Sequence, residues 1–175
     1  MIIWINGTFG VGKTTAAQGL QQRIRGSHLF DPELTGQLLR QQLPRETLAD
    51  DFQDEPLWRQ LNLVLLEQLD QPSAVIIVPM TLTNPDYFDE IIGALRSNGH
   101  QVQHVALMAS PATIRRRLRS RFERAQSWGG RQADERLRAL SHPVFSNHVD
   151  TDDLSKQQIV DVIGLLCDIQ LMPPG

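Results

Sequence analysis

The sequence is poor in the residues that crosslink chains, bind soft metals or cross membranes. Its one cysteine, Cys167, excludes an intramolecular disulfide and any cysteine-based metal site, and its apolar neighbours predict a buried thiol. No apolar run approaches the length of a membrane span. The net charge of -3 gives no overall attraction to nucleic acid or to an anionic membrane. Because apolar sequence begins at Ile2, no room is left for a signal peptide, and we expect a cytoplasmic protein.

Motifs of some nucleotide-dependent proteins are missing too. No N-K-x-D stretch is present to read guanine. The apolar run 74–78 is followed by Pro79-Met80-Thr81, without the aspartate that often follows this strand in ATPase motors. The five histidines show no metal-ligand spacing with acidic residues, and we expect His100 and His104 to lie at the surface. These absences disfavour guanine recognition, motor ATPases and histidine-based metal sites.

One stretch matches a phosphate-binding loop at every fixed position. Residues 7–14 read GTFGVGKT, which fits G-x-x-x-x-G-K-[ST]. The apolar run 2–5 before it predicts a buried strand, and Ala17, Leu20 and Ile24 after it recur at helical spacing. A loop of this kind lies between a strand and a helix, so the context supports the motif.

The residue types of this loop suit a polyphosphate. Glycines at both ends allow tight turns in which successive N–H groups point at phosphate oxygens, and the following helix adds a partial positive charge. We expect Lys13 to reach the β- and γ-phosphates and the Thr14 hydroxyl to ligate Mg²⁺. The predicted nucleotide-binding residues of the loop are Gly7, Thr8, Phe9, Gly10, Val11, Gly12, Lys13, Thr14 and Thr15.

Strands and helices alternate along the rest of the chain. The expected strands are 2–5, 27–30, 74–78, 102–108 and 144–149, and the expected helices include 34–42, 56–69, 84–98, 133–140 and 154–169. This order predicts an α/β protein, a three-layer P-loop NTPase fold with a five-stranded parallel sheet, in one domain spanning 1–175. In the helix 56–69, the residues expected to share one apolar face are Leu57, Leu61, Val64, Leu65 and Leu69.

Asp31 is the candidate catalytic carboxylate. It ends the second expected strand, and ligands of parallel sheets bind at the carboxyl ends of the strands. There it can accept a proton from a substrate hydroxyl or hold Mg²⁺ through water. Asp before Pro32 is also a common helix cap, and the two roles do not exclude each other. Capping is the stronger interpretation for Glu33.

Arginines concentrate between residues 115 and 136. Arg117 and Arg121 are four residues apart, so they share one helix face. Guanidinium groups stack on bases, bind phosphate oxygens and neutralise charge during phosphoryl transfer, so we expect an Arg-rich nucleotide lid at about 119–135. Arg136 is placed to close on the same phosphates. A solvated basic face and an RNA-binding patch are the alternatives.

Several segments resemble the nucleoside-monophosphate and small-molecule P-loop kinases. The segment ending in Arg40 resembles the part of adenylate kinase that grips the acceptor phosphate. Arg117 and Arg121 match the arginine pair that covers adenine and touches phosphate, and Arg136 resembles a later lid arginine. Residues 150–155 are similar to the segment flanking adenine. The resemblance implies ATP and Mg²⁺ as cofactors, with Thr14 and Asp31 as metal ligands and Lys13, Asp31, Arg117 and Arg121 as catalytic residues.

The chain also resembles the bacterial tunicamycin resistance protein family over nearly its whole length. The resembling blocks are 2–14, FDPE (30–33), DDFQDEPLWR (50–59), 76–96, LMAS (107–110) and TDDLS (151–155), and the IVPMT within 76–96 is absent from ordinary nucleotide kinases. The resemblance implies an ATP-binding protein that protects cells from a nucleoside antibiotic. Phosphorylation of the drug and its sequestration would give the same phenotype.

Family members can continue into a tail thought to help membrane association. The sequence ends at Gly175, so we expect no stable membrane insertion, with peripheral association and oligomeric state left open.

The acceptor side differs from that of adenylate kinase. Met80 stands after the third expected strand, where adenylate kinase has an arginine for the acceptor's phosphate. An acceptor without a terminal phosphate and with apolar parts suits this better. The predicted acceptor-binding residues, mostly in segment 31–70, are Asp31, Glu33, Arg40, Asp51, Phe52, Trp58, Arg59 and Met80. Trp58 has core packing as its alternative, and Asp51 has solvent exposure.

Overall fold

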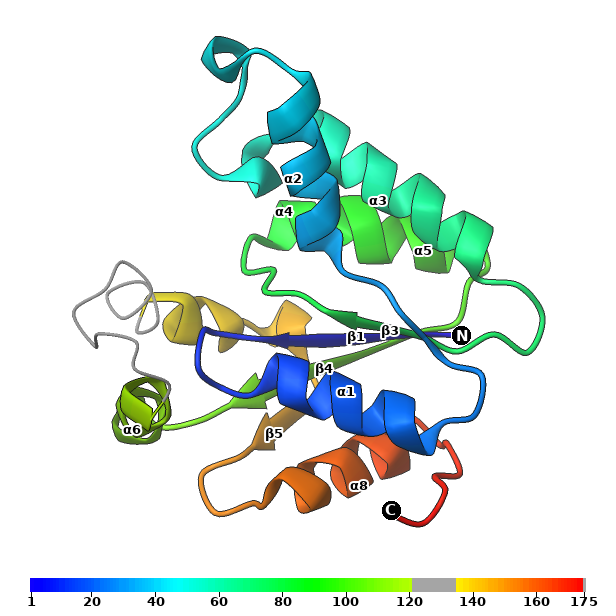
Figure 1. Ribbon diagram of the computed structural model, residues 1–175, viewed down its shortest axis with the longest axis vertical. Helices are drawn as coiled ribbons and strands as arrows, with labels where there is room; N and C mark the ends of the chain where they lie inside the picture. Colours follow the sequence, from blue (N-terminus) through cyan, green and yellow to red (C-terminus); the bar gives the residue numbers. More distant parts are fainter. Residues whose placement is uncertain (121–134, 175) are drawn as a thin grey trace.

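The computed structural model describes residues 1–120 and 135–174 and is built on a five-stranded sheet. The strands are β1 (Ile2–Gly7), β2 (His28–Leu29), β3 (Ile76–Pro79), β4 (Val102–Met108) and β5 (His148–Asp150). They lie in the order β2-β3-β1-β4-β5, and neighbouring strands pair in parallel. The predicted five-stranded parallel sheet is confirmed (Figure 1).

Helices connect the strands. They are α1 (Lys13–Arg23), α2 (Pro32–Gln42), α3 (Pro56–Leu69), α4 (Pro85–Phe88), η3 (Asp89–Gly93), α5 (Ala94–Ser97), α6 (Pro111–Ser120) and α8 (Lys156–Leu166), and residues 135–140 are also helical. Asp31 caps α2 and Asn84 caps α4, each before a proline. Ser155, one of two expected caps, begins α8 with a capping box.

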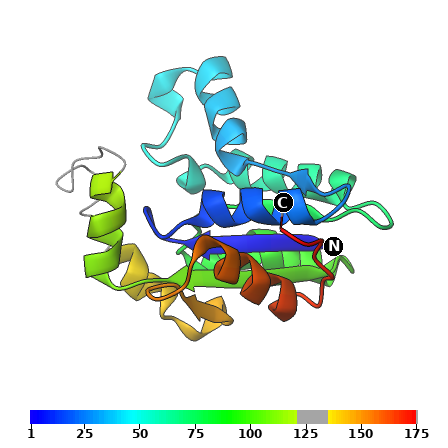
Figure 2. The same cartoon turned by 60° about the horizontal axis from the view of Figure 1, so that its bottom comes forward.

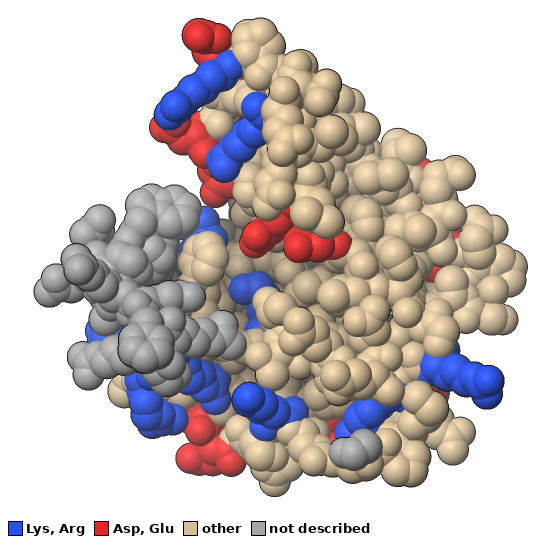
Figure 3. Space-filling view, in the orientation of Figure 1, with Lys and Arg blue, Asp and Glu red and all other residues tan. Residues whose placement is uncertain are grey.

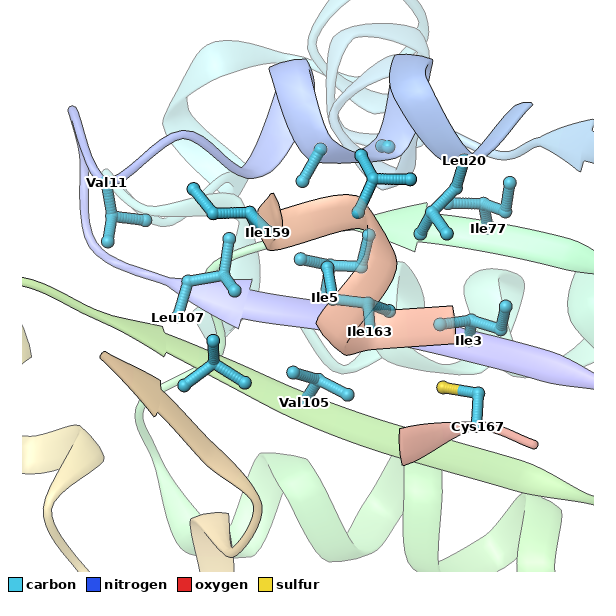
Figure 4. Close-up of a cluster of buried hydrophobic side chains, with 14 of the residues drawn as sticks. Ile3, Ile5, Val11, Leu20, Ile77, Val105, Leu107, Ile159, Ile163 and Cys167 are labelled. Carbon is cyan, nitrogen blue, oxygen red and sulfur yellow. The ribbon is translucent and has the colours of Figure 1, made fainter. Parts of the chain in front are cut away.

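Side chains of β1 alternate between the two faces of the sheet. Ile3 and Ile5 join the cluster covered by α1 and α8, together with Cys167, whose side chain is buried as expected (Figure 4). Ile2 and Trp4 join the cluster on the opposite face, under α3 and the helical run α4–α5. The helix after β1 and the helices after β3 therefore lie on opposite faces, which opens a crevice at the carboxyl ends of these neighbouring strands.

The segment between β2 and β3 projects from the sheet. Both α2 and the short turns η1 (Arg45–Thr47) and η2 (Phe52–Asp54) extend away from it in both views (Figure 1, Figure 2). In α3 the expected apolar face is wrong, because Leu57 and Val64 are exposed while Trp58 and Asn62 are fully buried. The Trp58 indole donates to the Pro32 carbonyl (2.9 Å), and this bond connects α3 to α2.

Two other expectations near β4 and β5 are corrected. The strand expected over 144–149 is shorter, because Pro143–Phe145 form a 3₁₀ turn, η4, that places the Phe145 ring in the core. His104 is only 2% exposed, not a surface residue. Its ring packs edge-on against Phe88, with ring centroids 4.9 Å apart.

Burial of His104 predicts a pH-dependent stability. Burial lowers its pKa to about 4, with the Ser146 carbonyl opposing and Arg96 and His148 adding to the shift. The unfolded chain therefore binds a proton between pH 4 and about 6.5 that the folded protein does not, so stability is complete above about 6.5 and is lost as pH falls toward 4. We expect urea unfolding to show roughly 2–3 kcal/mol less stability at pH 4.5 than at pH 7 from this group.

His104→Gln provides the control, because glutamine cannot titrate in this range. The variant is less stable at pH 7 but loses less stability than the wild type on going to pH 4.5. Equal losses in the two proteins would show that His104 is not the titrating group.

Candidate active site

The loop after β1 has the backbone that the motif requires. Gly7 has φ +146° and Gly12 has φ +112°, in the range that L side chains rarely adopt. A Cβ at Gly7 would lie 2.7 Å from Val11 Cγ1 and 2.9 Å from the Leu107 carbonyl. Gly12 caps α1 without a side-chain hydrogen bond, and the N-terminus of such a helix favours an anion.

Lys13 lies folded into the loop. Its Nζ donates to the Gly7 carbonyl (2.9 Å) and to the Thr8 carbonyl (3.2 Å), and it lies 5.7 Å from the centroid of the Phe9 ring. Burial lowers its pKa to about 8, with Glu33 opposing the shift and Arg136 adding to it. An anion reaching the loop offers Lys13 a stronger, charged partner than these carbonyls.

Two pockets flank this loop. The α8-side pocket, ≈ 320 Å³, is lined by Gly10, Val11, Gly12, Thr15, Ala16, Arg117, Leu154, Lys156 and Ile159. The α2-side pocket, ≈ 210 Å³, is lined by Phe9, Glu33, Arg40, Asp50, Asp51, Phe52, Gln53, Met80, Thr81 and Arg136. Consecutive loop residues, Phe9 and Gly10, belong to different pockets. Figure 3 shows side chains of both charges gathered on the side of the molecule that carries the carboxyl ends of the strands.

Arg117 forms part of the wall of the α8-side pocket. Its guanidinium donates to the Val11 carbonyl (2.9 Å), to the Thr151 hydroxyl (2.9 Å) and to the Thr151 carbonyl (2.6 Å). These bonds hold its plane against both the loop and the β5–α8 connection. The predicted partner, Arg121, and most of the predicted lid at 119–135 lie outside the described residues.

Arg136 links the loop to the α2-side pocket. Its guanidinium carbon lies 5.0 Å from the centroid of the Phe9 ring, and its Nη2 lies 3.4 Å from Asp51 Oδ2. Arg40 lines the same pocket, where it donates to the Asp50 carbonyl (2.9 Å) and stands over the Phe52 ring. Both arginines are thus held by protein groups, Arg136 by the Asp51 carboxylate and Arg40 by a backbone carbonyl.

Asp31 and Glu33 lie on the first turn of α2. Asp31 is half-buried, and its Oδ1 accepts the Glu33 N–H at 3.0 Å, so the predicted cap is present. A carboxylate has further acceptor capacity, which leaves Asp31 able to take part in chemistry. Glu33 is exposed and lines the α2-side pocket.

The donor set fits Mg²⁺ delivered with a nucleotide. Within residues 1–120 and 135–174, no group of three or more His, Cys, Asp or Glu side chains could hold a metal ion by itself. Thr14 is exposed on the first turn of α1. A hydroxyl such as that of Thr14 and a single carboxylate would suit an ion that takes its other ligands from phosphates and water.

Two predicted acceptor-binding residues, Trp58 and Arg59, do not line the α2-side pocket, and the burial of Trp58 favours its alternative of core packing. Trp58 is fully buried, with its ring 5.3 Å from that of Phe52, so it supports the pocket from within the core. Arg59 is 8% exposed, pairs with Glu90 and stacks on Tyr87. Met80 is 2% exposed and lines the α2-side pocket, and its role in binding an acceptor stays a prediction.

Sequence reasoning missed the buried polar residues around the loop. Asn6 is fully buried and bonded to Leu82, and Thr81 Oγ1 donates to the Gly7 carbonyl at 2.7 Å. Asn6 carried a usable signal, because a polar residue at the end of an apolar strand needs buried partners. Those partners are far away in sequence and are not apparent from the motif.

The loop, the sheet order and the flanking pockets define a nucleotide-binding protein of the P-loop kinase-like class. A family model described as an AAA domain matches residues 2–143. A gluconokinase from Sinorhizobium meliloti is 17% identical over 95% of this chain and 90% of that chain, with a TM-score of 0.64. The APS kinase of Mycobacterium tuberculosis is 14% identical over 95% and 96%, with a TM-score of 0.61. At these identities the likeness shows the fold alone.

A more similar structure identifies the family. The tunicamycin resistance protein of Deinococcus radiodurans is 33% identical, with 99% of this chain and 98% of that chain covered and a TM-score of 0.83. The chain belongs to the tunicamycin resistance protein family, which confirms the resemblance seen in its sequence. A search of the curated proteins found no significant match. In the described part of the chain, no helix is long and apolar enough to cross a membrane.

Proposed function

We propose that this protein binds Mg-ATP and transfers its γ-phosphoryl group to a hydroxyl of tunicamycin or of a related nucleoside-like molecule. The observation that supports this most is the pair of pockets meeting at the phosphate loop, with Gly10 in one and Phe9 in the other. A kinase needs a donor and an acceptor on the two sides of one transferred group. We assign the nucleotide to the α8-side pocket and the acceptor to the α2-side pocket, within a single domain whose acceptor segment is about 31–70.

Each of the predicted site residues has a separate role in the proposed phosphoryl transfer. Lys13 leaves the carbonyls of Gly7 and Thr8 and donates to the β- and γ-phosphates. Thr14 would hold Mg²⁺ directly and Asp31 would hold it through water, and the ion would neutralise charge on the phosphates. Asp31 accepts the proton of the acceptor hydroxyl. The hydroxyl oxygen bonds to the γ-phosphorus, and the bond between the γ-phosphorus and the bridging oxygen of the leaving ADP breaks. Arg117 and Arg121 cover the nucleotide, and Arg136 closes on its phosphates.

The charges of the α2-side pocket support an acceptor without a terminal phosphate. Arg40 and Arg136 are engaged by the Asp50 carbonyl and by Asp51, and Glu33 adds a negative charge to the wall. Phe52 and Met80 supply apolar surface beside these polar groups. A sugar or uracil with hydroxyl and N–H donors fits this lining better than a phosphate does.

The second candidate is a drug-binding protein whose ATP site controls its shape. Arg136 favours it, since this side chain touches Phe9 of the loop and Asp51 of the acceptor segment. Movement of the loop on binding ATP would then reach the acceptor pocket without any phosphoryl transfer.

Incubation with γ-labelled ATP, Mg²⁺ and tunicamycin separates the two functions. A kinase yields labelled drug whose mass has increased by one phosphoryl group, and Lys13→Ala yields none. Saturable drug binding, with the drug recovered unmodified, would refute the kinase and establish the binder. Absence of both transfer and binding would reject tunicamycin as the ligand.

A further inference from the structure

Asn6 connects the phosphate loop to the segment 80–82, which follows β3 and is called the acceptor wall below because Met80 and Thr81 line the α2-side pocket. Its side chain is fully buried at the end of β1. Oδ1 accepts two backbone N–H groups, from Gly7 (2.8 Å) and from Leu82 (2.9 Å). Nδ2 donates to the Leu82 carbonyl (2.7 Å) and lies 3.2 Å from His104 Nε2. All four hydrogen-bonding positions of the amide are therefore used.

Asn6 fixes the position of the phosphate loop relative to the segment after β3. Gly7 begins the phosphate loop, and Leu82 follows Met80 and Thr81, which line the α2-side pocket. Thr81 Oγ1 donates to the Gly7 carbonyl (2.7 Å), the same oxygen that accepts Lys13 Nζ (2.9 Å). The peptide at Gly7 is thus tied to the acceptor wall through its nitrogen and through its carbonyl.

His104 orients the Asn6 amide. Its Nδ1 lies 3.2 Å from the Ser146 carbonyl, and a carbonyl only accepts, so Nδ1 carries the hydrogen. Nε2 is then an acceptor, and the group facing it must be the NH₂ of Asn6 rather than its oxygen. The His104 ring also packs against the rings of Phe88 and Phe145. An amide turned by 180° would lose its bonds to His104, Gly7 and Leu82 together.

We propose that Asn6 is a positioning residue that sets the acceptor wall at a fixed distance from the phosphate loop, with His104 holding its amide in the required orientation. This inference rests on the proposed assignment of the acceptor to the α2-side pocket. Phosphoryl transfer requires the reacting atoms to be held within a few tenths of an ångström, and a displacement of about 1 Å costs roughly 100-fold in rate. Asn6 is fully buried and lines neither pocket, so its loss should affect the relation between the two sites more than either site alone.

The test compares Asn6→Ala with the wild type by titration calorimetry. Affinities for AMP-PNP alone and for tunicamycin alone should change by less than about 3-fold, whereas the factor by which AMP-PNP changes tunicamycin affinity should move to one. Where transfer is measurable, kcat should fall roughly 100-fold with little change in KM. An unchanged coupling factor in Asn6→Ala, or a factor of one in the wild type, would overturn the inference. A wild type that couples the ligands but transfers nothing leaves it intact and refutes only the kinase.

Variants at two partners keep the test valid if Asn6→Ala does not fold. Thr81→Val removes only the hydroxyl bonded to Gly7, at nearly constant volume, and should reduce the coupling. His104→Gln and His104→Asn lose the same ring packing, but glutamine places an acceptor near the Nε2 position and asparagine a donor near the Nδ1 position. We expect His104→Gln to keep more of the coupling than His104→Asn. The reverse order, with Thr81→Val unchanged, would contradict the role assigned to Asn6.

Discussion

Lys13→Ala should abolish measurable ATP binding and, with it, protection against the drug. In the folded loop the ammonium is held by two neutral carbonyls, and the triphosphate would replace them with charged oxygens. Removal of this partner leaves phosphate charge uncompensated inside the loop, which we expect to weaken binding at least ~100-fold, or about 2.7 kcal/mol. Titration calorimetry with ATP and Mg²⁺ measures the effect directly.

The chain offers a matched control in its other lysine, Lys156. Lys156 also lines the α8-side pocket, but it belongs to the start of α8 and not to the glycine-rich turn. Lys156→Ala should weaken ATP binding less than ~10-fold, as expected for a charge at the pocket rim. Similar losses for the two variants would show that net positive charge, not the loop geometry, binds the nucleotide.

The lowered pKa of Lys13 adds a pH dependence to the same measurement. Burial lowers the pKa of Lys13 to about 8 in the protein without nucleotide. Because the phosphates favour the protonated lysine, ATP affinity should be constant below this pH and should fall as pH rises through about 8. The fall should be missing in Lys13→Arg, whose guanidinium stays charged over this range. An ATP affinity that does not change from pH 7 to 9.5 in the wild type would contradict this role of Lys13.

Asp31→Asn should leave both ligands bound and remove turnover. Asparagine is as good a helix cap as aspartate, so the bond to the Glu33 N–H and the stability of α2 are expected to persist. The amide cannot accept the proton of the acceptor hydroxyl, and loss of a general base typically costs 10²–10⁴-fold in rate. Single-turnover transfer from labelled ATP, measured beside calorimetric binding of ATP and tunicamycin, separates the two effects.

Two further variants identify which carboxylate acts. Asp31→Ala removes the cap as well as the charge, so it should lower the unfolding free energy by about 1 kcal/mol more than Asp31→Asn. Glu33→Gln tests the exposed carboxylate that lines the α2-side pocket. If Glu33→Gln loses turnover while Asp31→Asn keeps it, Glu33 is the base and Asp31 is only a cap.

Local chemistry explains what could be predicted from the sequence. The spacing of Gly7, Gly12 and Lys13, a strand before them and a helix after them are contained in some twenty consecutive residues. Caps at Asp31, Asn84 and Ser155 follow from interactions within three residues of each helix start. The alternation of strands and helices then implies a parallel sheet, because each crossover must cover one face.

Burial within α3 and around β4 was not predictable in the same way. Leu57 and Val64 are more apolar than Asn62, yet Asn62 is the buried residue because Thr35 of α2 bonds to it at 3.0 Å. His104 looks like a surface residue in sequence, and only the folded chain brings Asn6 and Ser146 to its two nitrogens.

The sequence by itself determined the phosphate-binding loop, the class of sheet and the family, since each depends on residues close together or on a pattern repeated along the chain. Tertiary structure decided which side chains line the two pockets, that Trp58 and Arg59 are buried outside the lining of the α2-side pocket, and that Asn6 bonds to both Gly7 and Leu82. The physical reason is that a buried polar group is stabilised by partners from distant segments, and no local pattern records which segments meet.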